Sequence, residues 1–205
     1  MKIENPLYYS AVRSDVISIV PIKKYKRILE IGGGESNTLL ELAKLNQSEG
    51  WAIDLINVKH KNIKAIKGSI EDETVAKKIP DQYFDLILAC DLLEHLTDTD
   101  HFFSLMHKKL TKNGLLILSV PNIRQLRSLF YLFIKGSFPR YDAGLFDKTH
   151  LRWFCKKDVI NFASNNRFTL VDYKSVGRFV PNMLNQSVIS EFLALQNIFV
   201  FKKNI

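Results

Sequence analysis

Three consecutive glycines at residues 32–34 stand between two segments of different periodicity. Residues 28–31 are apolar and mostly β-branched, which is typical of a buried parallel strand. Residues 36–43 carry apolar side chains at helical spacing, with Ser36 as the expected N-cap. A strand, a glycine turn and a helix together direct backbone N–H groups at an anionic part of a ligand. The stretch therefore predicts a ligand-binding loop, and a tight turn without a ligand is the alternative.

An acidic side chain ends the next apolar segment. Residues 50–55 are predicted to form a strand, and Asp54 lies near its carboxyl end, about 20 residues beyond the glycines. A carboxylate can accept hydrogen bonds from both hydroxyl groups of a ribose, so this position favours a nucleoside ligand. A dinucleotide fingerprint would require glycine at position 37, where the chain has Asn37. We therefore do not expect a nicotinamide dinucleotide.

Predicted strands and helices alternate through residue 120. This alternation predicts a parallel, doubly wound sheet with helices on both faces. Loops that follow parallel strands meet at the carboxyl edge of the sheet, where such folds bind their ligands. The loops concerned are residues 32–36, 54–55, 69–72 and 91–95. Beyond residue 154, helices are predicted at 157–165 and 188–195 and strands at 168–176 and 197–202.

The alternation stops between residues 121 and 154. An insertion of this length after a strand is usually a lid or a substrate-binding segment. It contains Arg124, Arg140 and Arg152, whose guanidinium groups can bind phosphate or carboxylate in bidentate fashion. We expect its aromatic stretch, residues 129–138, to form the core of the lid. An acceptor pocket and a transient contact with a membrane surface are the alternatives for this stretch.

Two histidines are candidates for a general base, because imidazole titrates near neutrality. His95 follows the predicted strand at 84–90, and His150 lies in the insertion together with Asp147. A bracing role for either histidine is the competing interpretation. No group of Cys, His and Asp residues has the spacing of a metal-binding motif, so no metal site is predicted.

Composition narrows the class of protein. The chain has 205 residues, which suits a single domain over residues 1–205 with a lid at 121–154. Its net charge of +8 comes from basic residues scattered as doublets, whereas nucleic-acid binders concentrate theirs, so no nucleic-acid partner is expected. Two cysteines and no apolar leader favour a reducing, cytoplasmic location.

The motifs together resemble the class I S-adenosylmethionine-dependent methyltransferases over nearly the whole chain. The match rests on residues 28–34, on Asp54 and on Leu93-Glu94-His95 after an apolar strand. Residues 118–122 and 147–154 resemble a branch often found with cell-surface glycan biosynthesis. The resemblance implies a Rossmann-like sheet of seven strands, mostly parallel with the last antiparallel, and S-adenosylmethionine as the cofactor.

The resemblance also implies the site residues. The cofactor would contact Glu30, Gly32, Gly33, Gly34, Asp54, Leu55, Ser69, Ile70, Glu71 and Asp91. The acceptor would contact Asn122, Arg124, Arg140 and Arg152, with His95, His150 and Asp147 as catalytic candidates. Relatives commonly carry glycine at the position of Ser36 and an acid at that of Ser69. Because Ser36 can cap the helix, we expect cofactor binding to survive the first departure.

Three functions are compatible with these residues. The first is methyl transfer to a hydroxyl, or to an amino group, of a sugar or glycan precursor. The second is methyl transfer to a small aromatic or quinone-type acceptor, since the Leu-Glu-His motif also occurs in such relatives. The third is a non-catalytic cofactor-binding or nucleic-acid-binding protein. Ser36, Ser69 and the net charge favour the third, whereas intact Glu30 and Asp54 argue against it.

Overall fold

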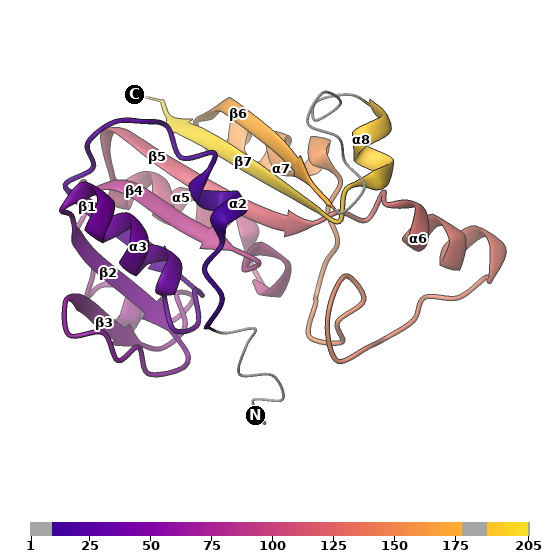
Figure 1. The fold of residues 1–205 in the computed structure, drawn as a ribbon, viewed down its shortest axis with the longest axis horizontal. Coiled ribbons are helices and arrows are strands. Elements are labelled where there is room, and N and C mark those ends of the chain that lie inside the picture. The colour runs from indigo at the N-terminus through magenta and orange to yellow at the C-terminus, as the bar shows by residue number, and fades with distance from the viewer. Residues whose placement is uncertain (1–9, 178–187, 205) are drawn as a thin grey trace.

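The computed structural model describes residues 10–177 and 188–204. Seven strands form one sheet in the order β3-β2-β1-β4-β5-β7-β6 (Figure 1). Strand β7 is antiparallel to both β5 and β6, and the other pairs are parallel. The strands are β1 Arg27–Ile31, β2 Glu49–Asp54, β3 Ile63–Lys67, β4 Phe84–Cys90, β5 Leu110–Pro121, β6 Phe168–Val176 and β7 Gln196–Lys203. The predicted Rossmann-like sheet of seven strands is therefore confirmed.

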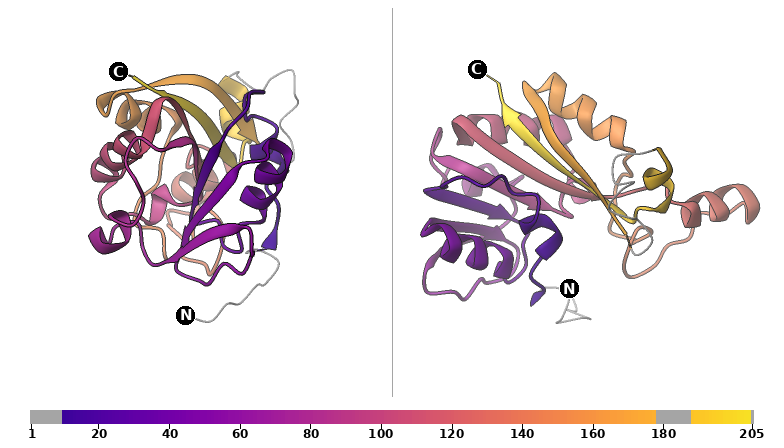
Figure 2. Two further views of the ribbon diagram at one scale, coloured as in Figure 1. Left: turned by 90° about the vertical axis from the view of Figure 1, so that its left-hand side faces the viewer. Right: turned by 45° about the horizontal axis from the view of Figure 1, so that its top comes forward.

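Helices cover both faces of this sheet, as expected for a doubly wound fold (Figures 1 and 2). Helices α2 and α3 contribute to one apolar core, and α4, α5 and α7 contribute to the other. The helices are α2 Ser14–Ile17, α3 Asn37–Asn46, α4 Glu73–Ala76, α5 Thr99–Lys109, α6 Leu126–Leu129, α7 Lys156–Asn165 and α8 Val188–Leu193. A 3-10 turn, η1 (Leu93–His95), follows β4, and a π-helix, η2 (Phe130–Ile134), follows α6.

The central strands owe their stability to burial on both faces. In β4 and in the second half of β5 nearly every residue is buried, which explains their continuous apolar sequence. Leu86 and Ile87 are both fully buried, yet they belong to different cores because successive side chains point to opposite faces. Each such side chain contributes about 1.5–3 kcal/mol through burial. This rigid centre fixes where the loops after β1, β2 and β4 meet.

Residues 121–154 leave the sheet after β5 and return at α7; we call this segment the arm. Its two ends are joined, because Ile123 N–H donates to the Phe154 carbonyl at 3.3 Å. Between them α6 and η2 extend beyond the ends of the strands (Figures 1 and 2). Among the described residues, no helix is both long enough and apolar enough to span a bilayer.

The prediction that the aromatic stretch 129–138 forms a core is wrong. Phe133 is 78% exposed and Ile134 is 72% exposed. The physical reason is that the arm extends away from the sheet, so no layer formed by the described residues covers η2. Ring contacts hold the returning part of the arm instead, including Phe138 against Trp153 at 4.6 Å between centroids.

Candidate active site

The glycine loop, residues 32–36, turns by means of left-handed backbone. Gly32 has φ +74° and Gly34 has φ +60°, a region that glycine enters without steric cost. Ser36 also has a positive φ of 58° and makes no capping hydrogen bond to α3. The prediction of a Ser36 cap is therefore wrong, because an N-cap needs extended backbone. Its hydroxyl is buried beside the carboxyl of Glu30.

Glu30 shapes the loop from beneath. Its side chain is 3% exposed and lies where a Cβ on Gly33 would stand, with the carboxyl carbon only 2.3 Å from that point. Residue 33 must therefore be glycine while Glu30 keeps this position. Burial raises the pKa of Glu30 to about 7. Glu30 supports the loop, and its contact with a cofactor stays a prediction.

Asp54 joins the loop to the neighbouring strand. Its Oδ2 accepts the Gly34 N–H at 2.8 Å, and its Oδ1 accepts the Ile56 N–H at 2.9 Å. The carboxylate is half-buried, and burial raises its pKa above the ordinary value. Each carboxylate oxygen has two lone pairs, so both can accept a further hydrogen bond from a ligand hydroxyl. Leu55 follows it and is 59% exposed beside the same loop end.

The loop after β3 holds the predicted adenine-side residues, and their contacts differ. Ser69 Oγ accepts the Glu71 N–H at 3.2 Å, and Ile70 is buried. Glu71 turns to the next loop, where its carboxylate accepts the Thr97 N–H at 2.7 Å and the Asp98 N–H at 3.2 Å. These bonds lower the pKa of Glu71 despite its partial burial. Glu71 thus ties the β3 loop to the start of α5.

Asp91 is held by an arginine from the segment ahead of β1. The Arg13 guanidinium donates to Asp91 at 2.6 Å and to the Gln196 side chain at 2.7 Å. Ser119 Oγ also donates to Asp91, at 3.1 Å. Arg13 lies just before α2, so the N-terminal segment reaches across the carboxyl edge to β4, β5 and β7. In the sequence, the one indication of these Arg13 contacts was the position of an arginine ahead of the first strand.

Glu94, His95 and His150 meet at the same edge; we call them the edge cluster. The three offer ligand atoms that all lie within 4.8 Å of one another. The rings of His95 and His150 meet edge to face at 4.8 Å between centroids, and His150 Nε2 lies 3.9 Å from Glu94 Oε1. The cluster adjoins the glycine loop, because a Cβ on Gly32 would lie 3.1 Å from Leu92 of the β4 loop.

The arm docks on the β4 loop to complete this cluster. Leu151 N–H donates to the Glu94 carbonyl at 2.9 Å. His150 Nδ1 lies 3.0 Å from the Leu145 carbonyl, and burial lowers the pKa of His150. Asp147, a predicted catalytic residue, accepts hydrogen bonds from the Thr149 N–H and hydroxyl at 2.8 and 2.7 Å. Asp147 therefore shapes the turn that carries His150.

The four predicted acceptor contacts are engaged within the protein. Asn122 is 1% exposed, and its amide donates to the Ala194 carbonyl at 3.0 Å, so it joins β5 to the α8 region. Arg124 pairs with Glu191. Arg152 donates to the Thr97 carbonyl at 2.7 Å, which fastens the arm to the start of α5.

Arg140 is the most exposed of these four residues. Its guanidinium donates to the Lys148 carbonyl and lies 5.8 Å from the centroid of the Trp153 ring. The structure thus brings together the loops of the carboxyl edge and His150, whereas Arg124 and Arg152 brace the ends of the arm.

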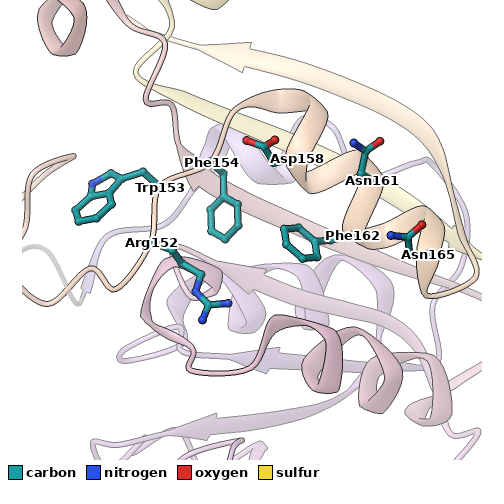
Figure 3. Close-up of a pocket in the computed structure, with 7 residues that line it drawn as sticks. All are labelled: Arg152, Trp153, Phe154, Asp158, Asn161, Phe162 and Asn165. Carbon is teal, nitrogen blue, oxygen red and sulfur yellow. The ribbon is translucent and has the colours of Figure 1, made fainter. Parts of the chain in front are cut away.

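A groove of about 490 Å³ lies along α7 (Figure 3). Arg152, Phe154 and Phe162 line it together with polar residues of α7, and Trp153 points away from the helix. No residue of the glycine loop or of the edge cluster lines this groove. The groove is therefore a separate surface feature.

Comparison with known proteins gave one family match and several similar structures. The sequence model of a family described as a methyltransferase domain matches residues 8–172. No curated protein matches the chain. An S-adenosylmethionine-dependent methyltransferase structure from Archaeoglobus fulgidus is 20% identical with a TM-score of 0.61, covering 87% of this chain and 86% of that one. One from Mesorhizobium loti is 11% identical with a TM-score of 0.65, covering 93% and 96%.

The fold also occurs in a protein of another named activity. The [4+2]-cyclase SpnF is 14% identical, with a TM-score of 0.65 over 94% of this chain and 79% of its own. At such identities a structural likeness shows the fold alone. The family match over residues 8–172 is what speaks to the activity.

Proposed function

This chain belongs to the methyltransferase domain family, and we propose that it transfers the methyl group of S-adenosylmethionine to a hydroxyl of a sugar or glycan precursor. It is an S-adenosylmethionine-dependent methyltransferase. The acceptor and the roles of individual residues are the proposed part. The observation that supports the proposal is the edge cluster, whose two imidazoles meet at the β4 loop, while Leu92 of the same loop lies against Gly32.

The donor fits the carboxyl ends of β1 and β2. Asp54 offers carboxylate lone pairs to the ribose hydroxyls, and the glycine loop lets a ligand approach the backbone closely. Glu30 and Ser36 lie buried together beneath this loop, so the loop rests on polar groups, which agrees with a polar ligand above it. When bound, the donor supplies a methyl group already activated by its sulfonium.

The acceptor hydroxyl belongs next to the edge cluster. His150 Nδ1 faces a carbonyl oxygen and so carries its proton, which leaves Nε2 with a lone pair. The lowered pKa of His150 keeps this imidazole neutral at pH 7. His95 is half-buried and is the more accessible of the two imidazoles. Orientation of the two substrates contributes most of the rate enhancement, on the order of 7–11 kcal/mol at best.

The transfer itself balances without another reactant. The acceptor oxygen forms a bond to the methyl carbon, the carbon–sulfur bond breaks, and its electron pair returns to sulfur as a neutral thioether. The proton of the hydroxyl leaves to the edge cluster, and general-base assistance of this kind contributes about 10²–10⁴-fold.

The experiment measures S-adenosylhomocysteine formation with a panel of nucleotide sugars and glycan precursors. His95→Gln and His150→Gln should each lower kcat by about 10²–10⁴-fold with the active acceptor. His101→Gln, on an exposed position of α5, is the matched control and should leave kcat unchanged. Turnover of no sugar, or full activity in both variants, would refute the proposal.

The exposed arm favours a second candidate acceptor. Phe130, Phe133 and Ile134 are exposed on η2, in the part of the arm that extends beyond the ends of the strands. A small aromatic or quinone-type acceptor, or the lipid part of a linked glycan at a membrane surface, would contact such side chains favourably. Turnover of a catechol or quinol in the same assay, with none of any sugar, would select the aromatic acceptor.

A further inference from the structure

The edge cluster contains more side chains than a general base requires, because one imidazole is enough to accept a proton. It contains two imidazoles and one carboxylate, supplied by η1 and by the arm, with ligand atoms within 4.8 Å of one another. Bonds of about 2.0–2.2 Å from a central ion would place such atoms roughly 3–3.5 Å apart. His150 Nε2 and Glu94 Oε1 are 3.9 Å apart, and atoms up to 4.8 Å apart would have to converge by about 1–2 Å around an ion.

Glu94 is the observation that points to a missing partner. Its side chain is 1% exposed, and neither carboxylate oxygen has a hydrogen-bond partner among the described residues. Buried carboxylates are normally hydrogen-bonded, paired or bound to a metal, because an unpartnered one is costly. Its one close cationic candidate, His150, lies beyond hydrogen-bond distance at 3.9 Å. A cation between them would satisfy Glu94.

Both imidazoles are held as metal ligands usually are. His150 Nδ1 lies 3.0 Å from the Leu145 carbonyl, and His95 Nδ1 lies 3.3 Å from the Thr149 carbonyl. A carbonyl oxygen only accepts, so each Nδ1 carries the proton and each Nε2 keeps its lone pair. Backbone carbonyls that fix the ring orientation in this way are the common outer shell of metal-bound histidine.

The surrounding charge also suits a cation. Asp91 and Asp147 act electrostatically on Glu94, so three carboxylates gather around the cluster. The one guanidinium nearby, Arg13, is already bound to Asp91, Asp15 and Gln196. The local field therefore favours a positive ion beside Glu94 and the two histidines.

We infer that Glu94, His95 and His150 form a binding site for a divalent first-row transition metal such as Mn²⁺, Co²⁺ or Zn²⁺. Two imidazoles and one carboxylate are a common ligand set for these ions and leave coordination positions open. This step rests on the proposed function and changes one part of it: with the ion bound, both imidazoles are ligands, and an acceptor hydroxyl at an open position loses its proton to water and not to an imidazole.

The test uses the untagged, chelator-treated full chain without donor or acceptor, so it is independent of methyl transfer. Co²⁺ is titrated while visible absorption is recorded, and Zn²⁺ is titrated by calorimetry. One ion should bind per chain, and Glu94→Gln and His150→Ala should each weaken binding by about 10–100-fold or more. His101→Ala, on exposed α5, should bind as the wild type does.

Folding is checked by circular dichroism and by retained S-adenosylmethionine binding in each variant. Glu94→Gln keeps the size of the side chain, so it separates metal binding from packing if His150→Ala fails to fold. Absence of stoichiometric binding by the wild type would overturn the inference. So would wild-type affinity in a folded Glu94→Gln variant, because the ion would then sit elsewhere.

Discussion

The glycine loop and the arm both border the carboxyl edge of the sheet, yet they are built differently. The loop is continuous with β1 and α3, and its geometry is fixed by buried groups such as Glu30 and by the Asp54 bond to Gly34. The arm is exposed over much of its length and is fastened at its ends by Asn122, Arg152 and the backbone of Leu151. The comparison teaches that the proposed donor site is built from local rigid backbone, whereas the proposed acceptor site depends on docking of a distant segment.

The largest effect on stability is expected at Glu30, and it depends on pH. Its pKa is about 7 in the folded protein, against an ordinary value of 4.5 in the unfolded chain. The raised pKa means that its contribution to stability is present below pH 4.5 and is lost as the pH rises to 7. At pH 8, Glu30→Gln should therefore exceed the wild type by about 3 kcal/mol in unfolding free energy.

Urea unfolding at pH 5 and pH 8 measures this difference. The advantage of Glu30→Gln should be small at pH 5 and large at pH 8. An advantage that is equal at the two pH values would show that Glu30 does not titrate as a buried acid, and the loop would then lack the support described here.

Gly33→Ala should change stability by a smaller amount, and in the opposite direction. Its free energy of unfolding should fall, because the new Cβ would lie against the Glu30 side chain. Overpacking of this kind costs about 1–3 kcal/mol, and displacement of the loop should weaken donor binding by at least about tenfold. The matched control is Gly136→Ala in the arm, where φ is +58° and the new Cβ meets nothing within 4 Å. The control should lose stability through backbone strain alone and keep its donor affinity; equal donor affinities in the two variants would contradict the comparison.

Ser36→Gly should stabilise the protein by about 1 kcal/mol. The change relieves left-handed backbone at φ 58°, and this gain should exceed the loss of the hydroxyl beside Glu30. Gln47→Gly at the other end of α3, with φ 56°, relieves similar strain away from the loop. Thermal unfolding should show a gain for both variants, while calorimetry should show a change in donor affinity for Ser36→Gly alone. A loss of stability in Ser36→Gly would mean that its hydroxyl has a stabilising role.

The smallest effect on stability is expected in the arm. Phe133→Ser replaces a side chain that is 78% exposed, so the unfolding free energy should change by less than about 0.5 kcal/mol. Donor affinity should stay the same, because this side chain is exposed on the arm and the glycine loop is held by Glu30 and Asp54. A rise in KM for the acceptor would assign η2 to acceptor binding. A clear loss of stability or of donor affinity would instead show that the arm and the loop are coupled.

The sequence predicted the parts of the fold that depend on local pattern. The strand at 168–176 and the helices near α7 and α8 were found because their periodicity and flanking residues are contiguous. The Ser36 cap failed because residue type does not reveal the sign of φ. The aromatic core of the arm failed because hydrophobicity does not show whether a layer will cover it.

Contacts between residues that are far apart in the sequence could not be predicted from it. Arg13 finds Asp91 and Gln196 only after β4 and β7 are placed in the sheet. Glu94 and His150 lie in different motifs. A metal-binding motif is recognised by ligands that are close in the sequence, so it could not reveal this pair. The loops proposed to bind the donor could therefore be located from the sequence, whereas the contacts between the arm and the carboxyl edge required the structure.

The central claim is that the loops after β1 and β2 bind the donor through Asp54. Calorimetric titration of the wild type with S-adenosylmethionine, with NAD as a control ligand, tests it most directly. The wild type should bind one equivalent of donor and no NAD. Asp54→Ala should lose at least about tenfold in affinity, and Asp142→Ala in the exposed arm should lose none. A folded wild type that does not bind, or equal binding by Asp54→Ala, would contradict the account.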